Sequence, residues 1–432
     1  MPQLTLREGA HYPVVVIGGG QAGLATSWQL TDRGLDHLVL EADRVGSEWR
    51  NRRWESFCLV TPNWQCRLPG FPYSGADGDG FMLRDEIVQY LEDYASSFEV
   101  PLVEGVRATG LEESAAEGFR VTTDRGTITA DQVVLATGPY QVPRIPRIAE
   151  RLPDHLAQVH SSQYRNPDQL PAGDVVVVGT GQSGCQIAED LHLAGRTVHL
   201  VTGTAPRVAR FYRGRDVVAW LDEMGYYAKG IEDFDDVDAV RFRVNHYVTG
   251  RDGGRDIDLR RFALEGMRLY GRLIDADGER LRFQQDLRAN LDHADAVSEG
   301  IKDSIDAYIA AHQLDAPEEP RYQPVWEPQV EPEELRLDGI DSVVWSTGFR
   351  RDDSWIRVPV FDGRGYPTHQ RGVTSVPGIY FIGLPWQHTW GSGRFGGVAD
   401  DAQYLAEQIV ARRMQTGVRW IAGLPRSAKT VA

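Results

Sequence analysis

The sequence has little cysteine and no close cysteine pair. Cys58, Cys66 and Cys185 are the three cysteines among 432 residues, which is too few for a disulfide framework. Cys58 and Cys66 form neither a C-x-x-C nor a C-x-x-x-x-C pair, so the spacing disfavours dithiol redox chemistry. Folding could still bring the two together, but buried cysteine usually serves as a small apolar side chain.

Excess positive charge and long apolar runs are also missing. Lysine and arginine total 46 against 62 aspartates and glutamates, a net charge of −16. Such a surface repels nucleic-acid phosphates and anionic membranes, so we expect neither as a partner. No run of about 18 apolar residues exists, and Met1–Tyr12 lacks a signal-peptide core. We expect a cytoplasmic protein with a small-molecule substrate and no metal site; a homodimer stays open.

One strand–helix–strand pattern occurs twice in the chain, which predicts two parallel-sheet domains. The elements expected in the two copies are Tyr12–Ile17, Gln21–Arg33 and His37–Leu40, then Asp174–Val178, Gln182–Ala194 and Thr197–Val201. Other expected elements are a helix over Arg84–Phe98, a β meander over Val106–Ala130, a strand over Gln132–Ala136, a proline-rich linker over Pro139–Pro171, a helix pair over Gln285–His312, strands over Ser342–Ser346 and Gly378–Ile382, and a helix from Gly397 to Arg412.

The first turn between strand and helix fits the dinucleotide fingerprint G-x-G-x-x-G. Its glycines allow a tight turn, let the backbone approach a pyrophosphate, and let the helix pack closely on the strand. The helix N-terminus then favours phosphate. Glu41 follows the second strand, where an acid bonds ribose hydroxyls. The residues expected to bind this dinucleotide are Gly18, Gly20, Gln21, Ala22, Gly23 and Glu41.

The second turn has the same fingerprint without the acid. The strand Thr197–Val201 is followed by Thr202 and Gly203, and then by Arg207, Arg210, Arg213 and Arg215. An acid would repel a 2′-phosphate and arginines would accommodate one, so we expect NADPH rather than NADH. The alternative is that these arginines form a solvated face. The residues expected to bind NADPH are Gly179, Gly181, Gln182, Ser183, Gly184, Thr202 and Arg207.

The order of motifs resembles the class B flavoprotein monooxygenases, a group that includes flavin-containing monooxygenases, the YUCCA enzymes and the Baeyer–Villiger enzymes. After each glycine turn, a strand ends in a Thr-Gly step, at Leu135–Gly138 and at Trp345–Phe349. In this group such steps mark crossings between the two domains. Gly46–Gly70 is similar to the flavin-flanking segment of YUCCA-like members. The nearest resemblance is to bacterial flavoproteins of nitrilase gene clusters, and it covers most of the chain apart from Arg215–Pro332.

The resemblance implies roles for further residues. An asparagine beside the flavin's reactive edge would be Asn63, and His388 would be a general acid or base; both have structural alternatives. The family's linker fingerprint keeps His160 and Tyr164, but Asp154 and Leu156 replace its Phe and Gly. The other implied flavin contacts are Trp49, Val106, Thr137, Gly138, Gly383 and the amides of Val398 and Ala399, and the implied substrate-pocket residues are Trp386 and Trp390.

The sequence therefore predicts an α/β protein with two Rossmann-like domains, one for FAD and one for NAD(P)H, and an inserted cap-like region. The expected segments are residues 1–165 for the FAD domain, 166–335 for the NADPH domain with an insertion at about 215–332, and 336–432 for the rest of the FAD domain. The insertion could cover the flavin or form a dimer contact.

The resemblance implies an NADPH-dependent monooxygenase in which a flavin C4a-hydroperoxide oxygenates an amine nitrogen or a sulfur, with molecular oxygen as co-substrate. A carbonyl carbon is the other target that the group attacks. The competing hypotheses are a flavoprotein reductase or dehydrogenase with another electron acceptor, and a non-catalytic nucleotide-binding scaffold. Intact glycines at both turns disfavour the scaffold.

Overall fold

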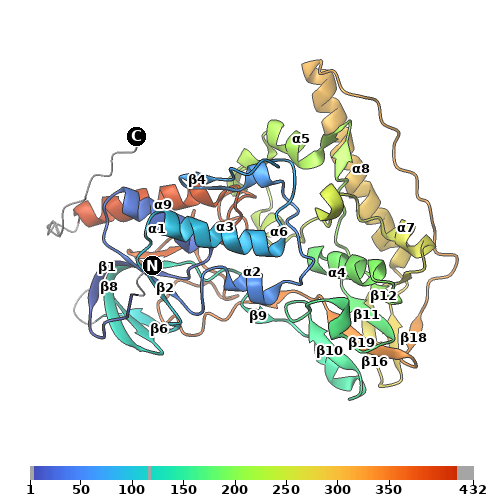
Figure 1. The fold of residues 1–432 in the computed structure, drawn as a ribbon, viewed down its shortest axis with the longest axis horizontal. Coiled ribbons are helices and arrows are strands. Elements are labelled where there is room, and N and C mark those ends of the chain that lie inside the picture. Colours follow the sequence, from blue (N-terminus) through green and yellow to red (C-terminus); the bar gives the residue numbers. More distant parts are fainter. Residues whose placement is uncertain (1–3, 115–117, 416–432) are drawn as a thin grey trace.

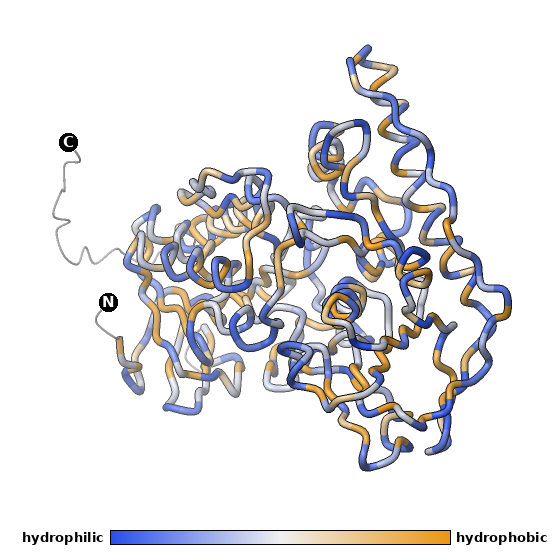
Figure 2. Tube along the Cα trace, turned by 45° about the vertical axis from the view of Figure 1, so that its right-hand side comes forward, coloured by the Kyte–Doolittle hydropathy of each residue, from blue (hydrophilic) through white to orange (hydrophobic). Residues whose placement is uncertain are grey.

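Two sheets form the two lobes of the chain (Figure 1), one with a parallel centre and antiparallel edge strands and the other parallel throughout. The computed structural model describes residues 4–114 and 118–415, so the ends of the predicted segments at 1–3 and 416–432 lie outside it. Apolar segments gather inside both lobes and polar segments face outward (Figure 2). Within the described ranges, no helix is both long and apolar enough to cross a bilayer. The prediction of two Rossmann-like domains is confirmed.

The first sheet has nine strands, in the order β21-β22-β23-β8-β1-β2-β5, and the hairpin β6–β7 extends from β8. Val14, Val15 and Val16 of the central strand β1 are fully buried, as expected for a parallel strand covered on both faces. The bounds are β1 His11–Ile17, β2 Leu38–Glu41, β5 Leu102–Glu104, β6 Ala108–Glu113, β7 Phe119–Thr123, β8 Gly126–Leu135, β21 His369–Gln370, β22 Val373–Thr374 and β23 Ile379–Phe381.

Helices from both ends of the chain pack on this sheet. The first helix, α1 (Gln21–Asp32), lies beside the last, α9 (Val398–Gln415) (Figure 1). Helix α3 (Arg84–Ser97) packs against α1 and against the short helix α2 (Ser47–Arg52). Because α9 returns to α1, the residues just before α9 lie close to the first glycine turn.

The second sheet has five strands, in the order β10-β19-β11-β12-β15, and carries helix α4 (Gln182–Leu193). The predicted domain boundaries at 165/166 and 335/336 fall in the wrong places, because β10 and β19 pair within this sheet from outside the predicted range. The strand bounds are β10 Ala157–His160, β11 Asp174–Val178, β12 Val198–Val201, β15 Arg268–Tyr270 and β19 Ile340–Trp345.

The insertion contains one long helix where the sequence predicted a helix pair. Helix α8 (Leu287–His312) runs unbroken through Gly300 and extends along the edge of the second lobe (Figure 1). Its buried residues recur three or four positions apart, from Leu287 and Leu291 to Ile305. This continuous buried stripe, mostly apolar but with Ser298 and Lys302 on either side of Gly300, outweighs the roughly 1 kcal/mol that a glycine costs inside a helix.

Shorter elements complete the insertion and the connections. Beside the insertion's helices lie a three-stranded sheet, β16-β17-β18, and the hairpin β13–β14. The bounds are α5 Val217–Glu223, α6 Val237–Arg241, α7 Leu259–Leu264, β3 Arg67–Leu68, β4 Phe71–Pro72, β9 Val142–Pro143, β13 Phe211–Tyr212, β14 Arg215–Asp216, β16 Leu273–Ala276, β17 Arg280–Phe283, β18 Glu334–Arg336 and β20 Phe349–Arg350.

Two antiparallel strands carry the chain between the lobes, at the predicted Thr-Gly steps. Strand β9 pairs with β20, and each follows its step closely, at Gly138 and at Gly348. The fully buried His160 lies with Nε2 2.9 Å from the Gly348 carbonyl and Nδ1 2.9 Å from the Ser162 hydroxyl. His160 thus packs in the linker and ties β10 to the return crossing.

A buried carboxylate joins three further segments at the same junction. Asp190 on α4 accepts hydrogen bonds from Ser56 of the first lobe (2.6 Å), from Tyr164 (2.7 Å) and from Arg251 of the insertion (2.8 Å). Its side chain is 6% exposed. Loss of Arg251 would leave an uncompensated buried charge, which typically costs about 3–5 kcal/mol. The first lobe, the linker and the insertion are therefore held together through α4.

Candidate active site

The first glycine turn forms a cradle for a phosphate. A Cβ atom at Gly23 would lie 1.8 Å from the Gly18 carbonyl oxygen, so only glycine permits this approach of α1 to β1. A Cβ atom at Gly20 would meet nothing within 4 Å. The backbone at Gly20 therefore borders open space at the N-terminus of α1, where helix amides favour an anion. The hollow fits the pyrophosphate of a dinucleotide.

Predicted neighbours of this first dinucleotide lie around the turn. Glu41, at the end of β2, accepts a hydrogen bond from the Gly19 amide at 2.7 Å, and burial raises its pKa. The Val106 amide donates to the Glu41 carbonyl, which places Val106 beside the ribose acid. Trp49 lies farther along and stacks on Phe395, with 5.7 Å between ring centroids. Thr137 and Gly138 lie at the crossing, where Gln141 bonds to both.

The second glycine turn repeats this geometry. A Cβ atom at Gly184 would lie 1.8 Å from the Gly179 carbonyl oxygen, and one at Gly181 would meet nothing within 4 Å. Thr202 stands in place of the acid at the end of β12, and the Thr180 hydroxyl of the turn accepts from the Gly203 amide at 3.0 Å. Ser183 lies in the first turn of α4, and the Gln182 amide group donates to the Val248 carbonyl of the insertion. This turn also fits a pyrophosphate.

Sequence reasoning missed one neighbour of the second turn. Asn290 on α8 donates to the Thr202 hydroxyl at 3.2 Å, and Thr202 in turn donates to the Tyr270 carbonyl at 2.8 Å. The long helix therefore reaches the end of β12, where the ribose of a dinucleotide would lie. No local pattern could have identified Asn290, because it lies 88 residues from its partner.

The arginines expected to hold a 2′-phosphate are bonded to carboxylates instead. Arg207 is buried and pairs with Asp295 at 2.6 Å. The other pairs are Arg210–Asp216, Arg213–Asp306 and Arg215–Glu223. The predicted contact of Arg207 with a 2′-phosphate therefore gains no support, since the buried carboxylate already neutralises its guanidinium. Arg210 also donates to the Val60 carbonyl, so it holds the insertion against the first lobe.

Asn63 has a structural role. Its side-chain oxygen accepts from the Met82 amide at 2.7 Å, and its side-chain nitrogen donates to the Asp77 carbonyl at 3.0 Å. Both ends of the amide thus hold the segment from Asp77 to Met82. Asn63 is 3% exposed and fixed by the backbone, so the predicted flavin-contacting role gains no support.

The loop before α9 lies over the first glycine turn. Gln21 of that turn donates to the Gly393 carbonyl at 3.0 Å, and a Cβ atom at Gly383 would lie 2.9 Å from that of Ala22. The Val398 amide, expected to face the flavin, is already bonded to the Arg394 carbonyl at 3.0 Å. The predicted flavin contact of Val398 therefore gains no support, because its amide closes the turn that begins α9.

The insertion folds back onto this loop, and its residues 226–245 are called the cap below; that the cap covers the flavin stays a prediction, as does a dimer contact. Tyr227 packs on Trp390 with 4.5 Å between ring centroids, and Phe234 packs edge-on against Trp386 at 5.4 Å. The Ile231 amide donates to the His388 carbonyl at 2.6 Å. The predicted substrate-pocket residues therefore lie between the cap and the first lobe.

His388 lies under the cap with a carboxylate partner. Its Nε2 is 3.3 Å from Glu232 of the insertion. Its backbone amide donates to the Ser392 hydroxyl at 3.1 Å, as does that of Thr389. The contact with Glu232 suits a histidine that holds the cap closed as well as one that moves protons.

Asp401 is a buried acid that sequence reasoning missed. It lies in the first turn of α9, is 1% exposed, and accepts a hydrogen bond from Ser392. Its Oδ2 atom has no hydrogen-bond partner. Burial raises the pKa of this carboxyl to about 6. Asp401 therefore supports the turn formed by His388, Thr389 and Ser392, at a cost in stability when it is ionised.

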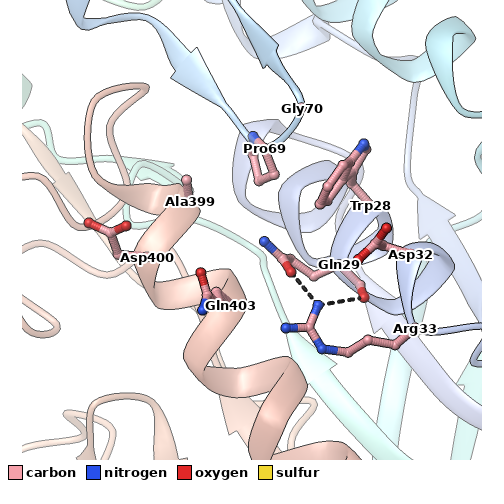
Figure 3. A pocket seen from close by; sticks show the side chains of 9 residues that line it. All are labelled: Trp28, Gln29, Asp32, Arg33, Pro69, Gly70, Ala399, Asp400 and Gln403. Atoms are coloured by element: carbon pink, nitrogen blue, oxygen red, sulfur yellow. Dashed lines mark hydrogen bonds between the residues drawn. The ribbon is translucent and has the colours of Figure 1, made fainter.

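Two surface pockets lie outside the glycine turns. One of about 400 Å³ lies between α1 and α9, and Figure 3 shows Arg33 bonded to Gln29 within it. Ala399 faces this outer pocket, which gives no support to its predicted flavin contact. The other, of about 690 Å³, lies between the first lobe and the insertion and is lined by Trp64, Asp79, Phe211, Gly214, Arg215, Asp216, Ala219, Asp222 and Glu223.

The cysteines are unsuited to thiol chemistry. All three are free and buried, and burial raises the pKa of Cys58 to about 11 and that of Cys66 to about 12. The pKa of Cys185 is raised as well. Since the thiolate is the reactive form, none of them suits a disulfide exchange at neutral pH. No group of three or more His, Cys, Asp or Glu residues within the described ranges could hold a metal.

Comparisons with known proteins agree with this geometry. A family model described as pyridine nucleotide-disulphide oxidoreductase matches residues 15–224. An uncharacterized CzcO-like oxidoreductase of Geobacillus kaustophilus is 36% identical over 92% of this chain and 98% of its own. The chain belongs to the CzcO-like oxidoreductases. The predicted family resemblance and class of enzyme are thereby confirmed.

More distant relatives are monooxygenases. The indole-3-pyruvate monooxygenase YUCCA1 of rice is 30% identical over 48% of this chain and 53% of its own. A solved flavin-containing monooxygenase from Stenotrophomonas maltophilia has the same fold, with a TM-score of 0.65 at 19% identity, covering 93% of this chain and 99% of its own. The CzcO-like oxidoreductases thus share a fold with flavin monooxygenases.

Two glycine substitutions separate folding from cofactor binding at the first turn. We expect Gly23→Ala to lower the thermal unfolding midpoint of the apoprotein, because its Cβ atom would collide with the Gly18 carbonyl. Gly20→Ala should leave that midpoint unchanged and weaken FAD binding about tenfold or more, because its Cβ atom enters the cradle. Thermal denaturation and FAD titration measure the two effects. Equal FAD affinity in Gly20→Ala and wild type would contradict the cradle.

The raised pKa of Asp401 predicts a pH dependence of stability. Between about pH 4 and pH 6 the folded state holds a proton that the unfolded state has lost, so stability falls as pH rises through this window. Asp401→Asn should abolish this decline and be more stable than wild type at pH 8, by on the order of 1 kcal/mol. Asp400→Asn, at an exposed neighbour, is the control. Parallel stability–pH curves for Asp401→Asn and wild type would contradict the assignment.

Proposed function

We propose that this chain is an FAD- and NADPH-dependent monooxygenase that oxygenates an amine nitrogen or a sulfur of a small molecule. The observation that carries the proposal is the pair of equivalent cradles, at Gly20 and at Gly181, in lobes joined by two crossings and covered by an aromatic cap. The structural likeness to a flavin-containing monooxygenase and the sequence similarity to YUCCA1 support the same reaction class.

In this proposal the residues of the chain bind, orient and exclude water, and FAD supplies the redox and oxygen chemistry when bound. The turn at Gly18–Gly23 with Glu41 holds the FAD pyrophosphate and ribose. The turn at Gly179–Gly184 holds NADPH. The cap, with Tyr227 on Trp390 and Phe234 on Trp386, keeps water from the reacting atoms.

The preference for NADPH rests on the missing acid and no longer on the arginines. At the end of β12 the counterpart of Glu41 is Thr202, whose hydroxyl donates to the Tyr270 carbonyl. A 2′-phosphate therefore meets no carboxylate in this position. Cytoplasmic location and a homodimer stay predictions.

We expect kcat/KM to be about tenfold or more higher with NADPH than with NADH, since a carboxylate at this position is what selects NADH. Initial rates of cofactor oxidation over a range of concentrations measure the ratio. Thr202→Asp places an acid at the end of β12, where Glu41 stands at the end of β2, and we expect it to reduce or reverse the preference. Equal kcat/KM values for NADPH and NADH in the wild type would refute the predicted preference for NADPH.

The competing function is a reductase that passes electrons to an acceptor other than oxygen. The buried thiols argue against a disulfide as the electron acceptor. A reductase with another acceptor would use the same two cradles. The two functions differ in what happens when reduced enzyme meets oxygen.

Stopped-flow mixing of NADPH-reduced enzyme with oxygen tests the proposal. We expect an absorbing intermediate before oxidised flavin returns, because the cap excludes the water that would release peroxide. NADPH oxidation and oxygen uptake, screened over amines and thioethers, should then show substrate-dependent consumption with little peroxide. Direct reoxidation with stoichiometric peroxide in the presence of NADP would favour the reductase.

A further inference from the structure

Arg394 occupies the boundary between the cap and the loop before α9. Its neighbours Gly393 and Phe395 face the first lobe: Gly393 accepts from Gln21, and Phe395 stacks on Trp49. The guanidinium of Arg394 instead reaches Asn245 of the insertion, where Nη2 donates to Oδ1 at 3.0 Å. Arg394 therefore lies where the first glycine turn, the loop and the cap meet.

The positive charge of Arg394 is uncompensated. Its guanidinium donates to Asn245 and to the Trp390 carbonyl, both neutral acceptors, and no carboxylate in residues 4–114 and 118–415 pairs with it. Arginine has five N–H donors, so these two bonds leave three for a ligand. The side chain is half-buried, and burial lowers its pKa. A cation in such a place gains from an anionic partner.

The surroundings of Arg394 are aromatic. Its guanidinium lies 4.0 Å from the centroid of the Trp390 ring, and the other face of this aromatic cluster is formed by Tyr227 and Tyr226. The ionisable groups that act on Arg394 electrostatically are the phenols of Tyr140, Tyr226 and Tyr227, which are neutral at pH 7. A chain of net charge −16 thus places an unpaired cation among half-buried rings.

We propose that Arg394, with Asn245, Trp390 and Tyr227, binds an organic carboxylate substrate whose apolar or aromatic body lies against the rings. This inference rests on the proposed function and narrows its substrate: the nucleophilic nitrogen or sulfur belongs to a molecule that also carries a carboxylate. A guanidinium binds a carboxylate through paired N–H donors, and the rings contact the flat body of the molecule. Simple cationic amines are disfavoured, because Arg394 repels them.

The same guanidinium chemistry would suit a cofactor phosphate, so the test separates the two sources. Phenylacetate, phenylacetamide and phenethylamine share one ring and carry a negative, a neutral and a positive group. Their binding to oxidised, FAD-loaded enzyme is measured by flavin difference spectra and tryptophan fluorescence, without NADPH or turnover. If none of these compounds binds as expected, the proposed monooxygenase function is not affected, because the stopped-flow experiment with oxygen tests it separately.

We expect phenylacetate to bind at least about tenfold more tightly than phenylacetamide, and phenethylamine to bind most weakly. Arg394→Gln should abolish the advantage of phenylacetate and leave phenylacetamide unchanged. Arg394→Lys, which keeps the charge and loses the paired donors, should retain part of it. Tyr227→Leu should weaken phenylacetate and phenylacetamide equally, because it removes a ring and no charge. Arg336→Gln, which removes an exposed arginine on β18, is the control.

Two results would overturn the proposal. One is equal binding of phenylacetate and phenylacetamide to the wild type. The other is an Arg394→Gln enzyme that keeps phenylacetate affinity but requires much more NADPH for half-maximal anaerobic flavin reduction, which would assign Arg394 to a cofactor phosphate. Should Arg394→Gln fail to fold, Arg394→Lys and Tyr227→Leu decide the same question.

Discussion

The fold depends on how closely a helix can approach the strand before it. At both glycine turns a Cβ atom on the last glycine would lie 1.8 Å from the carbonyl oxygen of the first, which no side chain can tolerate. Once α1 and α4 approach this closely, their N-termini point into the hollows at Gly20 and Gly181. One steric condition, met twice, thus creates two anion sites at the carboxyl ends of parallel strands in two sheets.

The position of one glycine turn relative to the other depends on charged and polar side chains between the lobes. The crossings at Gly138 and Gly348 carry the chain between lobes, and His160 bonds to the second of them. Asp190 then joins the first lobe, the linker and the insertion through one buried carboxylate. Because each partner comes from a different segment, these bonds fix how the two lobes lie relative to each other.

The local parts of this structure could be predicted from the sequence, and the long-range parts could not. Glycine spacing, strand length and the position of Glu41 are properties of about 30 consecutive residues, and the structure places all of them as expected. The arginines after β12 were misjudged because Asp295 and Asp306, which neutralise Arg207 and Arg213, lie on α8 about 90 residues later. The Val398 amide is a local exception, because it was assigned to the flavin and bonds instead to the nearby Arg394 carbonyl in the turn that begins α9.

The insertion shows how a common cofactor scaffold acquires its own specificity. The glycine turns form two cradles for phosphate, but the side chains that pair the cap with the loop before α9 lie outside them. Those side chains come from two segments about 150 residues apart, around Tyr227 and Asn245 and around Trp390 and Arg394. Two contacts need both segments: Tyr227 packs on Trp390, and Asn245 accepts from Arg394. Specificity in such a chain can therefore change through the insertion while both cofactor turns stay the same.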